Sequence, residues 1–213
     1  MLKTLQQRLQ AHTPLEINEP RPRAAVLIPI CDEAPPRLLL TLRNARLSSH
    51  PGQVAFPGGK LDPGETLLEC ALRETEEEVG LHREHIEVLG RLSDCISVNG
   101  LIVTPFVARI PARPTLTLNP AEIERALYLP INRLIDDDRA YTDAIALDDS
   151  RTLFVPSYAV DGAHLWGLSA MMVVELLTIG FDAALSLDTP PKRGELRTRS
   201  ARRPPPYSET PDD

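Results

Sequence analysis

Residues 73–80 read RETEEEVG and place four glutamates beside one arginine near the end of a predicted helix. A helix C-terminus carries roughly half a negative charge, so each glutamate in the last turn loses about 0.3–1 kcal/mol of stability. Glu74 and Glu78 are spaced at i and i+4, which adds a like-charge repulsion of roughly a few tenths of a kcal/mol. This unfavourable placement predicts that something outside the helix supplies a compensating positive charge.

The helix that carries these glutamates has recognisable ends. Thr66 and Glu69 form a T-x-x-E capping box behind the turn residues 62–64, and Gly80 is the residue type that ends helices. We therefore predict a helix over residues 67–79. At 100° per residue, four side chains share a narrow stripe that should face the core: Leu68, Leu72, Thr75 and Val79.

A second flank of this helix collects three carboxylates. Glu74, Glu77 and Glu78 lie at positions i, i+3 and i+4, where Cβ atoms are about 5–6 Å apart, which is close enough to share one or more divalent cations. Acidic helix faces are common, and three glutamates alone are more often a solvated surface. The adjacent pair Gly58 and Gly59 favours the metal site, because glycines let backbone carbonyls and amides approach a ligand closely.

Together these residues resemble the Nudix box, G-x5-E-x7-R-E-U-x-E-E-x-G-U, in which U is aliphatic. The match begins at Gly59, continues at Glu65 and ends with residues 73–81, RETEEEVGL. Thr75 stands at an aliphatic position, where its methyl group can still pack and its hydroxyl can bond back into the helix. The resemblance implies an α/β fold, an α/β/α sandwich around a mixed β-sheet, and an enzyme that splits a diphosphate linked to another group. It also implies that Arg73 pairs with Glu65.

The same resemblance implies a metal-dependent mechanism. Glu74 and Glu78 would be metal ligands, and Glu77 would be a further ligand or a proton acceptor. The carbonyl of Gly58 would be a backbone ligand. A diphosphate is a poor electrophile because its negative oxygens repel the attacking water, and Mg²⁺ or Mn²⁺ would neutralise those oxygens, orient the water and lower its pKa. The same oxygen ligands accept both ions, so the choice between Mg²⁺ and Mn²⁺ stays open.

Further blocks are similar to the coenzyme A pyrophosphatase branch of that family. They are residues 39–43 (LLTLR) and 52–59 (GQVAFPGG), which match its L-L-T-x-R and G-Q-V-x-F-P-G-G signatures, and residues 24–30 (AAVLIPI), 103–107 (VTPFV) and 165–170 (LWGLSA). The likeness implies hydrolysis of coenzyme A, or an acyl-CoA, to 3′,5′-ADP and 4′-phosphopantetheine or its acyl form. The alternatives are another nucleoside diphosphate derivative, such as ADP-ribose, NADH or an oxidised nucleotide, and a non-catalytic ligand-binding module.

Cationic residues just before the glycine turn could bind the substrate. Arg43, Arg46 and His50 lie where a substrate with a diphosphate and a separate 3′-phosphate would need positive charge. Gly58 and Gly59 complete the expected substrate-binding set. For Arg43 and His50 the alternative is an exposed side chain at a strand end or in a loop.

Three positions depart from the pyrophosphatase branch. Asn44 stands where the branch usually has serine or alanine, and Ser48 and Ser49 stand where basic residues are expected. Fewer cations would weaken the grip on a 3′-phosphate, so these positions bear on the choice of substrate and not on diphosphate cleavage.

Other side chains have weaker claims to a functional role. Glu122 and Glu124 follow Pro120 on a short helix predicted over residues 120–128, and Glu122 is the preferred candidate for an extra ligand or base, with helix surface as the alternative. Trp166 is expected in the core, with a place beside the substrate base as the alternative. The three cysteines lack a C-x-x-C spacing and are assigned structural roles: Cys31, Cys70 and Cys95.

Composition favours one globular domain and disfavours a broad nucleic-acid surface. The chain has 213 residues, of which 42% are hydrophobic, and a formal charge of -7 from 30 acidic and 23 basic side chains. The odd cysteine count and the lack of a cleavable signal or an apolar run of about 18 residues favour a cytoplasmic protein without a membrane span. A small molecule is the expected partner, and a homodimer stays open.

Hydrophobic periodicity predicts the elements around the motif. A leading helix is expected over residues 2–10 and a buried helix over residues 165–179. Strands are expected over residues 24–30, 37–42, 86–89, 96–98 and 101–110, with the first two paired as a hairpin. The predicted organisation is a helix and linker (1–20), the Nudix-like domain (21–187) and a disordered tail rich in proline and arginine (188–213).

Overall fold

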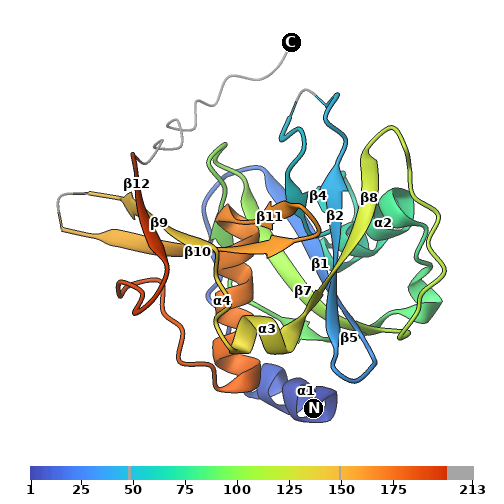
Figure 1. The fold of residues 1–213 in the computed structure, drawn as a ribbon. Coiled ribbons are helices and arrows are strands. Elements are labelled where there is room, and N and C mark those ends of the chain that lie inside the picture. Colours follow the sequence, from blue (N-terminus) through green and yellow to red (C-terminus); the bar gives the residue numbers. More distant parts are fainter. Residues whose placement is uncertain (48, 149, 201–213) are drawn as a thin grey trace.

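The computed structural model describes residues 1–47, 49–148 and 150–200, and within them a mixed eight-stranded sheet lies between helices (Figure 1). Its central strands have the order β3-β2-β1-β7-β5, with β4 paired to β1, β6 to β7 and β8 to β2. Strands β1 and β7 are parallel, and the other pairs are antiparallel. The strands are β1 (Arg23–Cys31), β2 (Arg37–Arg43), β3 (Val54–Ala55), β4 (Gly58–Lys60), β5 (Glu87–Arg91), β6 (Cys95–Ile96), β7 (Ile102–Ile110) and β8 (Ile123–Pro130).

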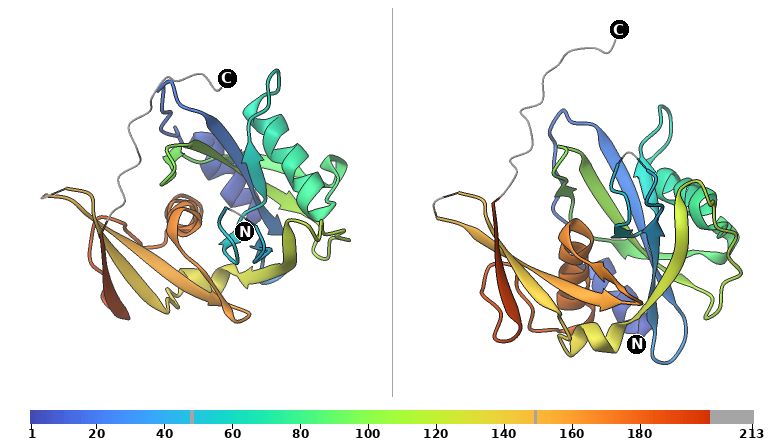
Figure 2. Two further views of the ribbon diagram at one scale, coloured as in Figure 1. Left: turned by 90° about the horizontal axis from the view of Figure 1, so that it is seen from above. Right: turned by 45° about the horizontal axis from the view of Figure 1, so that its top comes forward.

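A second sheet has the order β11-β10-β9-β12, and helix α4 lies between the two sheets, where Figure 2 shows it end-on in the left view. Its strands are β9 (Tyr141–Ala146), β10 (Thr152–Val160), β11 (Ala163–Leu165) and β12 (Glu195–Ser200). The helices are α1 (Leu2–Ala11), α2 (Leu67–Val79), the 3₁₀ turn η1 (Arg83–His85), α3 (Ile131–Ile135) and α4 (Gly167–Phe181). Across the described residues, none of these helices has the length and apolar character that crossing a bilayer requires.

Strand β1 is apolar at almost every position because helices cover both faces of the first sheet. Ile28 and Ile30 belong to the core cluster that includes α1 and α4. Ala25 and Leu27 point the other way and pack with Ala71 of α2. Successive side chains of a strand alternate between its faces, so a strand covered on both sides needs apolar residues throughout. The expected α/β/α sandwich is therefore confirmed.

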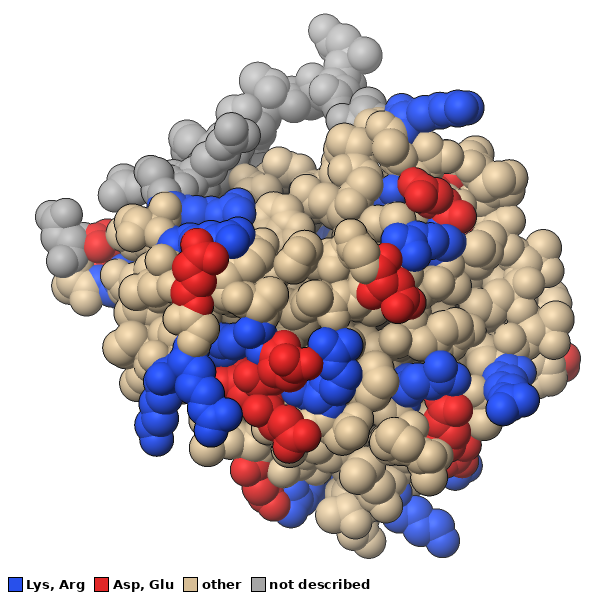
Figure 3. Space-filling model, viewed as in Figure 1, with Lys and Arg blue, Asp and Glu red and all other residues tan. Residues whose placement is uncertain are grey.

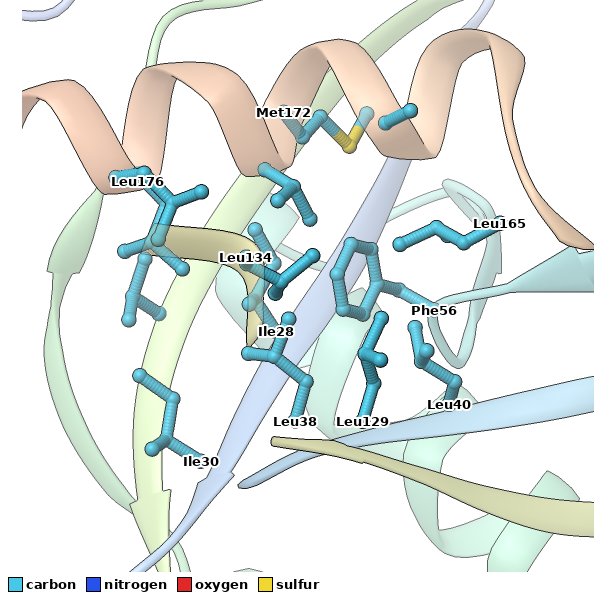
Figure 4. Close-up of a cluster of buried hydrophobic side chains, with 14 of the residues drawn as sticks. Ile28, Ile30, Leu38, Leu40, Phe56, Leu129, Leu134, Leu165, Met172 and Leu176 are labelled. Atoms are coloured by element: carbon cyan, nitrogen blue, oxygen red, sulfur yellow. The ribbon is translucent and has the colours of Figure 1, made fainter. Parts of the chain in front are cut away.

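The larger cluster fills the space between α4 and the first sheet. In Figure 4, Met172 and Leu176 of α4 lie opposite Ile28, Leu38 and Phe56, all of which are buried. Phe56 comes directly before the twin-glycine turn, so the packing of this ring helps to fix the start of that turn.

Helix α1 closes the same cluster from the N-terminal side. Leu5 and Leu9 are buried, and Leu5 lies against Gly180 of α4, where a Cβ atom would overlap its Cδ1. Arg8 adds a hydrogen bond from Nη1 to the Gly180 carbonyl at 3.2 Å. The first helix therefore packs into the core instead of standing apart from it.

Most of the expected elements are present. The helices predicted over residues 2–10 and 165–179 correspond to α1 and α4, and four of the predicted strands correspond to β1, β2, β5 and β7. The strand predicted over residues 96–98 shares only residue 96 with β6. Strands β1 and β2 pair antiparallel, as the hairpin prediction requires.

The helix predicted over residues 120–128 is wrong, because this segment forms a turn followed by β8. The carbonyl of Asn119 accepts hydrogen bonds from the amides of Glu122 (3.1 Å) and Ile123 (2.8 Å), which closes the turn. Strand β8 then pairs antiparallel with β2, with the buried pairs Leu38↔Leu129 and Leu40↔Leu127. Pairing with a distant strand thus prevails over the local helix signal.

The prediction of a disordered tail needs a correction over its described part. Strand β12 pairs in parallel with β9 over its whole length. The guanidinium carbon of Arg197 lies 3.7 Å from the ring centroid of Tyr141, and Nε of Arg199 lies 2.9 Å from the Asp143 carboxylate. Backbone pairing and these two arginine contacts hold β12 in place, because this segment has few aliphatic side chains to bury. The rest of the predicted tail, residues 201–213, lies outside the described residues.

A buried carboxylate ties the N-terminal segment to the first sheet. The Asp94 side chain is 1% exposed and accepts hydrogen bonds from the Ile17 amide (3.0 Å) and the Thr104 hydroxyl (2.7 Å). The guanidinium groups of Arg23 (3.0 Å) and Arg91 (2.8 Å) also donate to it. Burial opposes ionisation, but these hydrogen bonds outweigh it and hold the pKa of Asp94 below its usual range.

We expect Asp94→Asn to lower the free energy of unfolding at pH 7 by about 2–3 kcal/mol, because hydrogen bonds to a charged group are lost and two guanidinium groups lose their counter-ion. A lowered pKa means that the contribution of the carboxylate is complete above the unfolded-state pKa of about 3.9 and is lost as the pH falls through the lower folded-state pKa. The gap between wild type and variant should therefore shrink below about pH 4, which urea denaturation at several pH values measures.

The matched control is Asp138→Asn, which removes an exposed ion pair with Arg133 (2.7 Å). It should cost less than about 0.5 kcal/mol at any of these pH values. Equal losses for the two variants would contradict a stabilising role for the Asp94 network.

Candidate active site

Helix α2 has the expected caps at both ends. The Thr66 hydroxyl accepts a hydrogen bond from the Glu69 amide at 3.2 Å, and the Glu69 carboxylate accepts one from the Thr66 amide at 2.7 Å. At the other end Gly80 has a left-handed backbone (φ 69°) and donates to the Glu76 carbonyl at 2.9 Å. Local interactions thus fix the helix that carries the glutamates.

The buried face of α2 differs in part from the predicted stripe. Thr75 and Val79 are buried as expected, whereas Leu68 and Leu72 are only half-buried and Ala71 is fully buried. The Thr75 hydroxyl donates to the Ala71 carbonyl at 2.7 Å. Threonine therefore fits the aliphatic position of the motif without leaving an unpaired hydroxyl in the core.

Glu78 is the most buried carboxylate of the cluster. Its side chain is 3% exposed, its Oε1 lies 3.4 Å from Nη1 of Arg43, and its Oε2 has no hydrogen-bond partner among the described residues. Burial is the main cause that raises the pKa of Glu78 to about 8; Arg43 opposes the rise, and Glu74 and Glu122 add to it. An unpartnered buried carboxyl oxygen is costly, so this position lacks positive charge.

Glu74 lies against the twin-glycine turn. A Cβ atom on Gly59 would overlap the carboxyl group of Glu74, so only glycine lets the turn approach this side chain so closely. A Cβ atom on Gly58 would instead overlap the backbone carbonyl of Ala25 in the sheet. Burial raises the pKa of Glu74, although the hydrogen bond from Arg73 acts to lower it.

Arg73 lies within ion-pair distance of four carboxylates at once, one of which is Asp62, 3.7 Å from its Nη2. Its Nη2 is 2.8 Å from Glu65, and its Nη1 is 2.9 Å from Glu74 and 3.1 Å from Glu77. The expected pair with Glu65 is therefore present, and hydrogen bonds from Arg73 lower the pKa of Glu65 to about 2. Arg73 also donates to the Lys60 carbonyl at 3.2 Å, which joins the end of β4 to the helix. Glu77 is 56% exposed and forms the open rim of the cluster.

A fourth carboxylate reaches the cluster from the turn before β8. Glu122 accepts a hydrogen bond from the Asn119 side chain at 3.1 Å, and its charge contributes to raising the pKa values of both Glu74 and Glu78. Glu124 is exposed on β8 and is not among the causes of either shift. The structure therefore brings Glu122 to the cluster, and not Glu124.

Sequence reasoning missed two features of this site. Arg43 was expected to face the substrate, yet its guanidinium lies against Glu78. Asn119 was not singled out, although its amide donates to the Glu78 carbonyl at 2.9 Å and its side chain holds Glu122. The Asn-Pro dipeptide at residues 119–120 is a turn signal and could have placed a connection here.

The other basic candidates lie on the loop after β2. Arg46 and His50 are exposed. Nδ1 of His50 is 2.9 Å from the Gln53 side chain, and its Nε2 is 3.4 Å from that of Asn99. Of the three basic candidates, Arg43 alone touches the carboxylate cluster in the described contacts.

Asn44 has a structural role at the end of β2. Its amide donates to the Glu122 carbonyl at 2.7 Å, and its side chain donates to the Pro120 carbonyl at 2.9 Å. Asn44 therefore ties the loop after β2 to the turn that carries Glu122. Ser49 is exposed, and Ser48 lies outside the described residues.

Trp166, Cys31 and Cys95 stand apart from this cluster, whereas the Cys70 thiol donates to the carbonyls of Gly59 (3.5 Å) and Lys60 (3.3 Å). Trp166 is half-buried, which corrects its expected place in the core, and the guanidinium carbon of Arg199 lies 5.2 Å from its ring centroid. All three cysteines are free thiols, and burial raises the pKa to about 11 for Cys31 and Cys70 and to about 12 for Cys95. Such thiols are poor nucleophiles at neutral pH, which favours structural roles.

The cluster has the donors of a divalent-metal site. Among the described residues, no three His, Cys, Asp or Glu side chains stand in a ready metal-binding arrangement, because arginines hold the carboxylates. The hard oxygens of Glu74, Glu77 and Glu78 nevertheless fit Mg²⁺ or Mn²⁺. An added cation would satisfy the orphaned Oε2 of Glu78 and relieve the repulsion between the glutamates.

Known proteins similar to this chain are Nudix hydrolases. A NUDIX domain matches residues 20–148, more than half of the chain. A protein of Photorhabdus laumondii subsp. laumondii described as "Uncharacterized Nudix hydrolase NudL" is 37% identical over 166 residues, 76% of this chain and 87% of that protein. The NudL of Citrobacter koseri is 39% identical over 163 residues, 75% of this chain and 84% of that protein.

Among solved structures, a Nudix hydrolase from M. smegmatis, RenU, has a TM-score of 0.47 and 24% identity, and the alignment covers 55% of this chain and 74% of that one. The domain match and the two NudL relatives carry the assignment. The chain belongs to the Nudix family and is a hydrolase that acts on the pyrophosphate bonds of nucleoside diphosphate derivatives.

Proposed function

We propose that this chain hydrolyses the diphosphate bond of coenzyme A, or of an acyl-CoA, to 3′,5′-ADP and 4′-phosphopantetheine or its acyl form. The observation that carries the hydrolase chemistry is the cluster of Glu74, Glu77 and Glu78 beside the twin-glycine turn. The choice of coenzyme A rests on the resemblance of residues 39–43 and 52–59 to the pyrophosphatase branch.

Nudix hydrolases generally use divalent metal ions, and we infer that Mg²⁺ or Mn²⁺ serves here. Glu74 and Glu78 would hold the ion, with Glu77 and the carbonyl of Gly58 as further ligands. When bound, the ion neutralises diphosphate oxygens and lowers the pKa of a water.

The chain also supplies groups that suit a phosphate-bearing substrate. The guanidinium of Arg43 lies beside Glu78, where it would put positive charge close to a phosphate held at the carboxylate cluster. Gly59 leaves no side chain between the turn and the Glu74 carboxyl group, so a ligand held by Glu74 would lie close to the backbone of the turn. Arg46 and His50 stand on the exposed loop, where they would meet the 3′-phosphate.

Two carboxylates compete for the role of general base. Glu77 is our first choice, because it is exposed at the rim and can reach a water molecule. Glu122 is the alternative, because the Asn119 side chain holds it in place near Glu74 and Glu78.

We further propose that the catalytic unit spans residues 21–187 and works in the cytoplasm. The support for this location is the odd number of cysteines without a C-x-x-C spacing, which disfavours a secreted disulfide scaffold.

Turnover of a substrate panel tests the proposal: coenzyme A, acyl-CoAs, ADP-ribose, NADH and 8-oxo-dGTP, each with Mg²⁺ and with Mn²⁺. We expect the highest kcat/KM for coenzyme A or an acyl-CoA. A further substrate, 3′-dephospho-CoA, measures the contribution of the 3′-phosphate, and its kcat/KM should be lower than that of coenzyme A. Preference for ADP-ribose, NADH or 8-oxo-dGTP would favour the second substrate class. Failure to cleave any of them would leave a ligand-binding module.

Glu77→Gln should lower kcat at least roughly tenfold, because an amide cannot accept the proton of the attacking water, while the melting temperature stays near that of wild type. Steady-state kinetics on the best substrate and a thermal melt measure the two effects. The control is Glu76→Gln, the neighbouring glutamate, which is paired with His82 at 2.8 Å outside the cluster and should keep normal turnover. Near-normal turnover of Glu77→Gln would remove Glu77 from the mechanism.

The two glycines of the turn should respond differently to alanine. Gly59→Ala displaces the flexible Glu74 carboxyl group, so turnover should fall at least roughly tenfold with little loss of stability. Gly58→Ala pushes against the sheet backbone, so it should cost roughly 1–3 kcal/mol of folding stability or more. Kinetics and urea denaturation of both variants measure the contrast.

Gly64→Asn serves as the control for both glycine variants. A Cβ atom at Gly64 meets nothing within 4 Å, and asparagine tolerates the positive φ of 89°. The control should change neither turnover nor stability by much. If Gly59→Ala kept full activity, the close contact between the turn and Glu74 would not matter for catalysis.

A further inference from the structure

A polar cavity of about 200 Å³ lies between the C-terminal end of α3 and the chain that leads into β12. Its walls come from residues 136, 137, 139, 184–186 and 189–193. None of these residues belongs to the carboxylate cluster on α2. The cavity is therefore a separate feature of the fold, and the chemistry proposed for the cluster does not use it.

A buried arginine lines this cavity in a fixed orientation. The Arg139 side chain is 6% exposed, its Nε lies 2.6 Å from Asp137, and its Nη1 donates to the Thr142 hydroxyl at 3.0 Å. No hydrogen bond from its Nη2 to another described residue is present. A guanidinium held on two sides presents its remaining donor in a set direction.

The charges around the cavity leave an excess of positive charge. Three cations line it (Arg139, Lys192 and Arg193) against two acids (Asp136 and Asp137), which gives an excess of one. Asp137 is already occupied, because it accepts from Arg139 at 2.6 Å. Figure 3 shows that basic and acidic side chains lie side by side on the face of the molecule seen in Figure 1. The unneutralised charge thus favours an anion over a cation.

The size and the neutral lining indicate which anion fits. A pocket for a drug-sized ligand usually has about 300–1,000 Å³, so this cavity suits a smaller group. The hydroxyls of Ser186 and Thr189 line it as well and can donate hydrogen bonds. Tetrahedral phosphate oxygens accept from an arginine fork, a lysine and hydroxyls together.

We propose that this cavity binds a phosphate group, supplied either by inorganic phosphate or by the phosphomonoester end of a nucleotide. Hydrolysis of a pyrophosphate bond produces phosphomonoester ends, so ligands of this class are present wherever the enzyme works. A bound phosphate would join Lys192 and Arg193 to Arg139 and would hold the segment before β12 against α3.

Isothermal titration of the full chain, without divalent cations, tests the proposal with inorganic phosphate, AMP and acetate as probes. We expect phosphate to bind with a dissociation constant on the order of 1 mM, since few atoms make contact. Lys192→Ala/Arg193→Ala should weaken phosphate binding about tenfold, as both side chains are exposed and each contributes modestly. AMP binding with the same loss in this variant would identify the phosphomonoester as a ligand, and phosphate binding alone would identify the inorganic ion.

The matched control is Lys3→Ala/Arg113→Ala, which removes the same charge from exposed positions elsewhere and should leave phosphate binding unchanged. Arg43→Ala, which removes the cation at the carboxylate cluster, should also leave it unchanged. The proposal is overturned by a wild type that does not bind phosphate, by equal affinities of the two double variants, or by acetate binding as tightly as phosphate. Loss of phosphate binding in Arg43→Ala would place the anion at the carboxylate cluster and would overturn it as well.

Discussion

The crowding of negative charge on one flank of α2 is the constraint on which the rest of the site depends. Glu74 and Glu78 sit one helical turn apart, largely withdrawn from water, and Glu122 approaches from another element. Burial and mutual repulsion both disfavour their ionised forms. Arg73 and Arg43 offset part of this cost, and neither reaches Oε2 of Glu78. The fold therefore leaves negative charge at this site that is only partly neutralised, and a small, hard cation can neutralise the rest.

Several elements that are far apart in the sequence hold these carboxylates in position. The capping box and Gly80 fix the helix, β4 brings the twin-glycine turn against Glu74, and the turn before β8 presents Glu122. Arg73 joins the first two of these parts, and Asn44 joins the loop after β2 to the third. The site is held by backbone contacts as much as by side chains, which explains why small residues matter at its edges.

Much of the fold and of the site could be predicted from the sequence, because the signals were local. The capping box over Thr66 and Glu69 and the apolar run of β1 each reflect physics within a few residues. The failures were non-local. Residues 120–128 contain residues that form helices, but the pairing of β8 with β2 decides their structure. Strand β12 has no hydrophobic pattern, and its place depends on β9 and on Arg197 over Tyr141, which no window of the sequence reveals.

The clasp between α1 and α4 has a consequence for how the chain reaches its native state. Arg8 and Gly180 are 172 positions apart, yet they share a hydrogen bond, and Leu5 fills the space that Gly180 leaves. Contacts between such distant positions require a large loop to close before they contribute any stability. On a ribosome, Leu5 therefore stays without its partner on α4 until nearly the whole domain has emerged, whereas Leu9 can already pack against Gly90 of β5. Among the described helices, α4 is made last, and it completes the packing around the first one.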